Sequence, residues 1–232
     1  MKNIYKNIFW FLGDNHHSNA FLVISDNEST IIDSGMGNYL NFWGSSDKAQ
    51  AELEKVIKEF NVKKIILTHA HIDHSGGIFS LKKELIDKLV ISAYNYEAEM
   101  LEKPEIDYIS PVSGIKDIGK IKVTERLTED SEIQIGEYFF KVIHTPGHTK
   151  GSICLYDEKF KILFSGDTIF PHGNIGRTDF RSSGGNSKEL VQSVQRLADL
   201  KVDLLCSGHG PPVMQNVENQ IQRSLEFAKS II

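Results

Sequence analysis

The segment 64–74 constrains the fold of this chain more than any other part of the sequence. It begins with the apolar, β-branched run KIILT and continues directly into three histidines, His69, His71 and His74, and one aspartate, Asp73. The first part is typical of a buried strand. Because the polar side chains follow that strand without a break, we expect them to project from a loop at a sheet edge. Imidazole and carboxylate groups bind zinc, iron or manganese, so the spacing favours part of a metal site over a polar loop without a metal.

Three further side chains repeat the pattern of an apolar run, a turn of small residues and a potential metal ligand. They are His148, Asp167 and His209, and each comes directly after a glycine. Glycine permits backbone conformations that other residues resist, so it suits such a turn. Taken singly, each side chain is equally compatible with an ordinary loop residue. Together with the histidine-rich segment they form a sufficient ligand set of five histidines and two aspartates.

The order of strand and helix patterns predicts two sheets packed together with helices outside them. Apolar residues spaced along one helical face predict a helix at 47–60, and Asn186 with Glu189 forms a capping-box pattern at the start of a later helix. The remaining expected elements are strands at 20–24, 30–32 and 64–68, helices at about 77–89 and 93–101, hairpins pairing 132–135 with 138–143 and 152–156 with 161–164, a loop at 168–186, a strand at 202–206 and a C-terminal helix.

Composition and charge argue against several classes of protein. The 232 residues contain no repeat or linker, which predicts a single domain over residues 1–232, and the net charge of -5 argues against a nucleic-acid partner. With no apolar run long enough to span a bilayer and no export-signal pattern, we expect a cytoplasmic protein with no membrane partner. Cys154 and Cys206 lie in apolar runs and are expected to be buried reduced thiols, with a disulfide or a catalytic thiol as alternatives.

These residues resemble the metallo-β-lactamase-like superfamily and, within it, the glyoxalase II (hydroxyacylglutathione hydrolase) branch. The superfamily pattern His-x-His-x-Asp-His matches residues 69–74, the later ligands match His148, Asp167 and His209, and an early aspartate after a strand matches Asp33. The resemblance covers about residues 18–212. It implies an α/β (α+β) fold, a four-layer αββα sandwich with the site at one edge of the two sheets. That branch usually carries a C-terminal helical region that recognises glutathione, and the sequence after His209 has room for one helix, so we do not expect glutathione specificity.

The resemblance also implies a site for two divalent metal ions, zinc being expected and iron or manganese being alternatives. Asp167 would bridge the ions, and Asp33 would orient the histidine loop. The other ligands fall into two sets, His69, His71 and His148 for the first ion and Asp73, His74 and His209 for the second.

Such a site predicts a hydrolase that cleaves a small thioester or lactone through a hydroxide shared by the two ions, with Asp73 orienting that hydroxide. The stretch 176–180, GRTDF, is similar to one in persulfide dioxygenases and supports an alternative, a single iron on His69, His148 and Asp167. A phosphodiesterase or nuclease is a third reading, and a non-catalytic metal-binding module is the least favoured. We expect a small acyl substrate as the partner, and a homo-oligomer remains open.

Several other residues are interpreted more modestly. His16 and His17 are expected at the surface, His144 as a structural hydrogen-bonding residue, and Arg177 as a brace for its loop with Asp179. The alternatives are substrate contacts for His16, His17 and Arg177 and a place at the pocket mouth for His172. Three tyrosines are expected to be packed rather than catalytic, namely Tyr94, Tyr96 and Tyr108.

Overall fold

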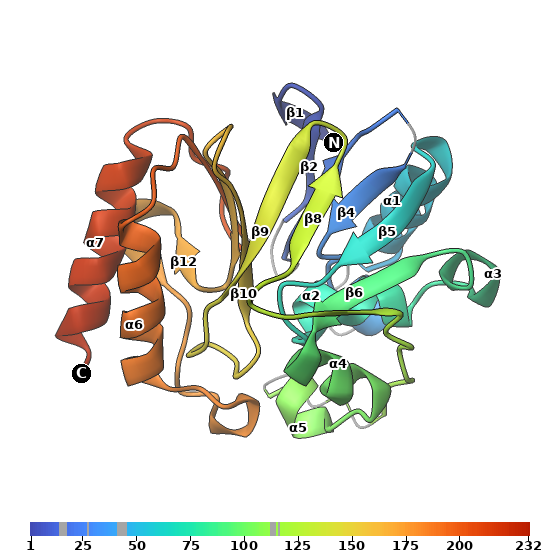
Figure 1. Ribbon diagram of the computed structural model, residues 1–232. Coiled ribbons are helices and arrows are strands. Elements are labelled where there is room, and N and C mark those ends of the chain that lie inside the picture. The colour runs from blue at the N-terminus through green and yellow to red at the C-terminus, as the bar shows by residue number, and fades with distance from the viewer. Residues whose placement is uncertain (14–17, 27, 41–45, 112–114, 116) are drawn as a thin grey trace.

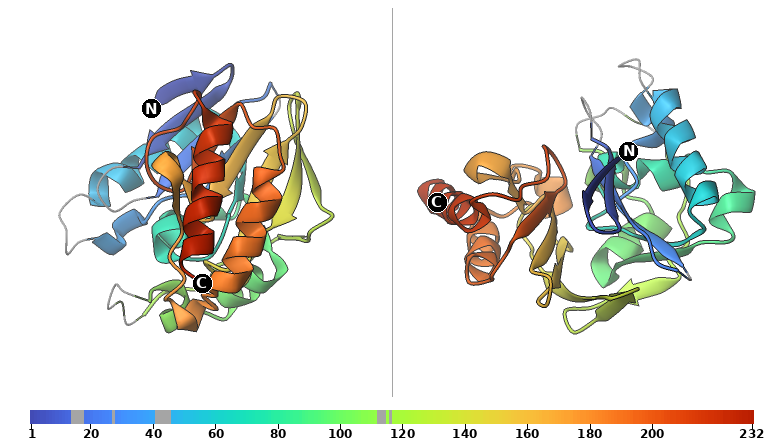
Figure 2. Two further views of the ribbon diagram at one scale, coloured as in Figure 1. Left: turned by 90° about the vertical axis from the view of Figure 1, so that its left-hand side faces the viewer. Right: turned by 90° about the horizontal axis from the view of Figure 1, so that it is seen from above.

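The computed structural model describes residues 1–13, 18–26, 28–40, 46–111, 115 and 117–232, so His16 and His17 lie outside the described residues. Two sheets face each other, and helices cover the outer side of each (Figure 1). Seen from above, the four layers follow one another from α7 to α1 (Figure 2). This arrangement confirms the predicted αββα sandwich.

The first sheet has seven strands in the order β1-β2-β3-β4-β5-β6-β7. Neighbours are antiparallel as far as β4 and parallel from β4 to β7. The apolar run 8–12 forms the whole of this sheet's second strand. The strand bounds are β1 Lys2–Tyr5, β2 Ile8–Leu12, β3 Asn19–Val23, β4 Ser29–Ile32, β5 Val62–Ile66, β6 Val90–Tyr94 and β7 Glu125–Leu127.

The second sheet has five strands in the order β14-β11-β10-β9-β8. Both predicted hairpins are confirmed, since Gln134 pairs with Phe139 and Leu155 pairs with Phe164. The predicted loop 168–186 contains a small two-stranded sheet and two short 3-10 helices. The bounds are β8 Glu132–Ile135, β9 Tyr138–His144, β10 Ile153–Asp157, β11 Ile162–Gly166, β12 Ile169–Phe170, β13 Asn174–Ile175 and β14 Leu204–Ser207.

Among the described residues, five α-helices lie on the side of the first sheet and two on the side of the second (Figure 1). Asn186 caps one of them as predicted, because its side-chain oxygen accepts from the backbone N–H groups of Lys188 and Glu189. The helices are α1 Ser46–Glu59, α2 Ile72–Phe79, α3 Lys83–Ile86, α4 Asn95–Glu102, α5 Ile106–Ile109, α6 Ser187–Ala198 and α7 Val217–Ser230, with 3-10 helices η1 Gly37–Leu40, η2 Pro171–Gly173 and η3 Arg181–Ser183.

Two helix predictions are wrong in their bounds. The helix expected at 77–89 is two helices, because α2 already begins at Ile72 and ends where the Ser80 hydroxyl donates to the carbonyl of Gly76. The helix expected at 93–101 starts only at Asn95, because the residues before it pair with β5 as strand β6. A side-chain hydrogen bond in the first case and strand pairing in the second override the local helical pattern.

Three apolar clusters match the spaces between the four layers. One lies between the first sheet and its helices, one between the sheets, and one between the second sheet and α6 with α7. Between the sheets, the Phe164 ring packs edge-on against Phe21 and Phe140 at 5.2 and 5.4 Å. Within the described part of the chain, no helix is long and apolar enough to cross a membrane.

Candidate metal centre

The seven predicted ligands lie together at one edge of the two sheets. Their ligand atoms fall into two groups, and within each group all of them lie within 4.8 Å of one another. We call these the first and second groups. The first follows β5 and β9, and the second follows β5, β11 and β14. The first group is His69, His71 and His148, and the second is Asp73, His74, Asp167 and His209.

Strand direction explains why residues so far apart in sequence meet here. β9 and β11 are both antiparallel to β10, and β14 is parallel to β11, so these three strands end at the same edge. At that edge, Ile153 N–H of the second sheet donates to Thr68 C=O of the first at 3.0 Å. Asn19 N–H of the first sheet donates to Gly208 C=O of the second at 2.6 Å. The ligand loops are therefore tied to both sheets.

Two of the predicted turn glycines allow a close approach that a side chain would block. A Cβ at Gly208 would lie 2.1 Å from Asp167 Oδ1 and 2.7 Å from His74 Cε1. Gly147 has φ +131°, and a Cβ there would lie 2.4 Å from the backbone nitrogen of Leu190. Both positions need glycine for the neighbouring histidine to reach the site.

Hydrogen bonding determines which nitrogen of His71 carries the proton. The Ser183 hydroxyl donates its only hydrogen to the Tyr108 carbonyl at 2.7 Å, so it accepts from His71 Nε2–H at 2.9 Å. His71 Nδ1 is then left with a free lone pair. Burial lowers the pKa of His71 to about 3, which keeps the ring neutral.

The other two rings of the first group follow the same logic. His148 Nδ1–H donates to the Arg177 carbonyl at 2.8 Å, which leaves Nε2 with a free lone pair. Thr68 Oγ1 donates to Asp33, so it accepts from His69 Nδ1–H at 3.2 Å, which leaves His69 Nε2 free. Burial lowers the pKa of both rings. The first group therefore has three neutral imidazole rings whose ligand atoms lie within 4.8 Å of one another, and two of these atoms, His148 Nε2 and His71 Nδ1, are only 2.9 Å apart.

The second group combines carboxylates with protonated rings. His74 Nδ1–H donates to Asp33 Oδ2 at 2.8 Å, and its Nε2 lies 3.1 Å from Asp167 Oδ1. Although burial favours neutral His74, Asp167, Asp33 and Asp73 raise its pKa well above the usual value. In the same way, burial opposes but Asp167 and Asp73 raise the pKa of His209 to about 10. Burial raises the carboxyl pKa values, but His74 and His209 lower those of Asp73 and Asp167 overall.

The residues present fit divalent metal ions. Among the described residues, buried His69 Nε2 has no hydrogen-bond partner, and buried His74 Nε2 and Asp167 Oδ1 face each other 3.1 Å apart as an ion pair. Unsatisfied buried polar atoms are rare in folded proteins, and a bound cation would give His69 Nε2 and Asp167 Oδ1 a partner. Histidine nitrogens with carboxylate oxygens are ligands that suit zinc, iron and manganese.

Comparison with known families agrees with this geometry. The family model of the metallo-beta-lactamase superfamily matches residues 13–209. The chain belongs to this superfamily. Hydroxyacylglutathione hydrolase GloC of Haemophilus influenzae is 28% identical over 204 residues, 83% of this chain and 85% of that protein. Human acyl-coenzyme A thioesterase MBLAC2 is 28% identical over 222 residues, 84% of this chain and 76% of that protein. The solved structure of TTHA1623 in a di-iron-bound form is 25% identical with a TM-score of 0.66, covering 94% of this chain and 96% of that one.

In this member of the superfamily the second group is the solvent-facing side of the centre. The side chains of Asp73 and His209 are 24% and 37% exposed, whereas those of the first group are almost fully buried. Phe170 packs edge-on against His209 at 5.7 Å, and Phe180 packs edge-on against His71 at the same centroid distance. Aromatic rings therefore stand beside both groups.

The predictions for the remaining polar residues have mixed outcomes. His144 stacks on Tyr94 at 4.4 Å and contacts the Lys150 carbonyl through Nε2, which confirms a structural role. Arg177 pairs with Asp179 at the surface and lies over the Phe180 ring at 4.6 Å, and His172 is exposed. Tyr94 and Tyr96 are half-buried, and Tyr108 is buried. Cys154 and Cys206 are buried and free, as expected.

The sequence pattern does not single out Asn19, yet its side chain holds the loop that carries His209. Asn19 Nδ2 donates to the Ser207 carbonyl at 2.8 Å and to the Gly210 carbonyl at 2.6 Å. Its Oδ1 accepts from Trp10 Nε1–H at 2.8 Å. A lone asparagine at the start of a strand carries no local signal for such a role.

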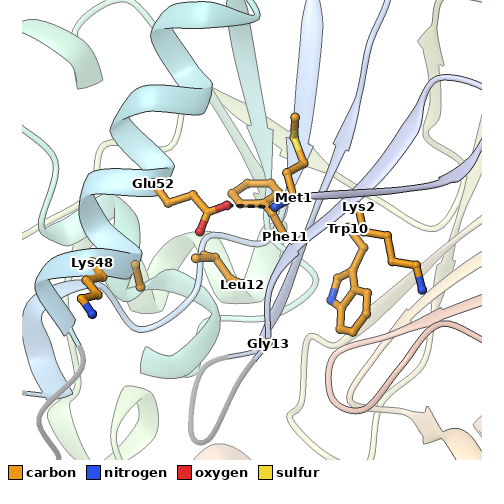
Figure 3. A pocket seen from close by; sticks show the side chains of 9 residues that line it. Met1, Lys2, Trp10, Phe11, Leu12, Gly13, Lys48 and Glu52 are labelled. Atoms are coloured by element: carbon orange, nitrogen blue, oxygen red, sulfur yellow. Dashed lines mark hydrogen bonds and ion pairs between the residues drawn. The ribbon is translucent and has the colours of Figure 1, made fainter.

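A surface cavity of about 500 Å³ lies between β1–β2 and α1 (Figure 3). The N-terminal amino group contacts Glu52 across it at 3.3 Å. Its lining contains none of the seven site residues, although Trp10 connects it to the His209 loop through Asn19. The metal centre, with its converging ligand atoms, is therefore the stronger candidate for chemistry.

Proposed function

We propose that this protein is a hydrolase that binds two divalent metal ions and cleaves a small thioester or lactone. The observation that carries the proposal is the adjacency of two groups of unlike chemistry, one with three neutral imidazole lone pairs and one with two carboxylates. Asp167 lies between them, with Oδ1 3.1 Å from His74 and Oδ2 3.5 Å from His148. Two ions at such a site lower the pKa of bound water and polarise a carbonyl oxygen.

The grouping of the ligand atoms supports an assignment of ligand roles. We assign His69, His71 and His148 to one ion and Asp73, His74 and His209 to the other, with Asp167 shared. Asp33 fixes the tautomer of His74 through its hydrogen bond to Nδ1. Asp73 is the carboxylate most open to solvent, so it is placed to accept a hydrogen bond from the attacking water and orient it.

The substrate class is proposed from the relatives and from the site together. The two relatives above are a hydroxyacylglutathione hydrolase and an acyl-coenzyme A thioesterase, and both names describe the cleavage of an acyl group. A thiolate or alkoxide leaving group departs more readily than an amide nitrogen, which favours thioesters and lactones. The net charge of -5 argues against a nucleic-acid polymer as the substrate.

The proposal is tested with protein purified without added metal. Elemental analysis should find about two transition-metal ions per chain, and a chelator should abolish hydrolysis and lower the melting temperature together, because a ligand that binds the native state stabilises it. In a panel of thioesters, lactones and bis-p-nitrophenyl phosphate, a thioester or lactone should turn over fastest. Faster turnover of the phosphodiester, or oxygen uptake with a persulfide in the absence of any hydrolysis, would contradict the proposal.

A further inference from the structure

One buried carboxylate beside the metal centre belongs to neither group of ligands. Glu97 lies in the first turn of α4, and its side chain is fully buried. The proposed hydrolysis does not use it. A buried carboxylate is costly unless its oxygens accept hydrogen bonds, so its partners show what it does.

Four donors surround this carboxylate. Oε2 accepts from the backbone N–H of Ala70 at 2.7 Å. Oε1 accepts from the hydroxyls of Tyr108 and Thr149 at 2.6 and 2.8 Å, and from the backbone N–H of Gly151 at 2.9 Å. Burial raises the pKa of Glu97, and these donors act against that rise.

Three of the four donors belong to the two loops that carry the first group, and the fourth, Tyr108, lies in α5. Ala70 lies between His69 and His71 in the loop after β5, whereas Thr149 and Gly151 follow His148 in the loop after β9. The first loop comes from one sheet and the second from the other. The carboxylate of Glu97 therefore links the two loops directly, one oxygen to each.

A second path leads from the same carboxylate to a ligand ring. Tyr108 donates to Glu97 through its hydroxyl, and its carbonyl accepts from the Ser183 hydroxyl at 2.7 Å. Ser183 in turn accepts from His71 Nε2–H, the bond that leaves His71 Nδ1 free. The position of Tyr108 thus connects Glu97 to the tautomer of His71.

The shape of the loop after β9 supports the same role independently. A Cβ at Gly151 would lie 2.7 Å from Glu97 Oε1 and 2.8 Å from Cγ. Any side chain at this position would push the carboxylate away from the loops. The absence of a side chain at Gly151 is therefore what lets Glu97 reach them.

We propose that Glu97 is a positioning residue that holds the two loops of the first group at the spacing one divalent ion requires. The inference rests on the metal-binding part of the proposed function. Glutamine at this position keeps the size of the side chain but replaces one acceptor oxygen with an NH₂ group. Whichever way that amide turns, it places a donor against a backbone N–H of one of the two loops.

The test measures Zn²⁺ affinity by competition with a chromophoric chelator, together with thermal unfolding of the metal-free protein. Loss of a hydrogen-bonding group in the shell around metal ligands weakens metal binding by roughly 10–100-fold. Glu97 bonds to the residues beside the ligands, so Glu97→Gln should weaken the binding of one of the two ions by up to about that factor. The other ion should bind as in the wild type. Tyr108→Phe removes one of the four donors and leaves the carboxylate in place, so it should give a smaller loss at the same ion.

Asp157→Asn is the matched control. Asp157 is also a buried carboxylate, and it accepts two backbone N–H bonds, from Phe139 and Phe160, each at 2.7 Å. It lies at the opposite end of β10 from Ile153, so this variant should lower the melting temperature and leave both Zn²⁺ affinities unchanged.

Three outcomes would count against these assignments. If Glu97→Gln or Tyr108→Phe folds and binds both ions as tightly as the wild type, the positioning role is wrong. If Glu97→Gln does not fold, Gly151→Ala replaces it, since the added methyl displaces the carboxylate without removing it, and unchanged Zn²⁺ affinity in that variant overturns the role equally. A wild type that binds no Zn²⁺ would instead overturn the proposed metal-dependent function itself.

Discussion

Substituting Asp33 with asparagine should disturb the second group through the proton on His74. Asp33 accepts three hydrogen bonds of 2.8 Å, from Thr68 N–H and the Thr68 hydroxyl and from His74 Nδ1–H. Asparagine has one acceptor oxygen in place of two. The backbone N–H of Thr68 cannot become an acceptor, whereas the hydroxyl and the imidazole can. The amide oxygen should therefore face Thr68 N–H, and its NH₂ group should face His74.

The consequence is a change of tautomer. In the neutral form of His74, which is the form able to bind a metal, Nδ1 must then accept, so the single proton is held on Nε2, the atom that lies 3.1 Å from Asp167 Oδ1 and faces the second group. A nitrogen that carries a proton cannot bind a metal. Loss of such an outer partner costs roughly 10–100-fold in metal affinity, or about 1.4–2.7 kcal/mol.

The assay is chelator competition with Zn²⁺ on Asp33→Asn, with Asp157→Asn as the control for a buried carboxylate away from the site. One of the two binding steps should lose affinity by about the factor above. The Asp157→Asn control should bind both Zn²⁺ ions with wild-type affinity. An Asp33→Asn variant that binds two ions with wild-type affinity would show that Asp33 does not set the proton position on His74.

Three further predictions concern the second group. His209→Ala should lose one metal equivalent and most of the hydrolytic rate, and elemental analysis with a thioester assay checks this against His148→Ala, which should damage the first group. Raised pKa values keep His74 and His209 protonated in the metal-free protein, His209 up to about pH 10. Binding there must displace protons, so affinity should rise with pH by about tenfold per unit for each proton, and calorimetry in buffers of different ionisation enthalpy would report the release. Gly208→Ala places a methyl group 2.1 Å from Asp167 Oδ1 and should lower the free energy of unfolding by about 1–3 kcal/mol, measured by denaturant unfolding. It should also weaken metal binding, measured by metal titration.

The side chains that converge at the candidate metal centre could be picked out from the sequence because their segments follow strands. A ligand directly after a glycine at a strand end is a local pattern, visible at His148, Asp167 and His209 without knowledge of sheet order. The start of α2 was harder to predict, because the metal motif itself forms its first turn. Asp73 and His74 lie inside that turn, where two following glycines make the pattern look like a loop.

The residues that support the ligands could not be predicted in the same way. Glu97 sits in an ordinary helical pattern, and its partners lie 11 to 54 residues away along the chain. Asn19 contacts the His209 loop from 188 residues away. Such contacts depend on how the two sheets meet, and neither residue has a local signal in the sequence.

The division of the first group between the two sheets has a mechanical consequence. His71 and His148 are 77 residues apart and lie 2.9 Å from each other, where the loops of opposite sheets meet. An ion held by both rings acts as a cross-link that closes this long loop, much as a disulfide would. The apolar layer holds the two sheets together by non-directional packing, whereas the metal cross-link would join them at one edge through directional bonds. Removing the ion should therefore speed unfolding more than it slows folding, so that the lifetime of the folded protein depends on metal supply.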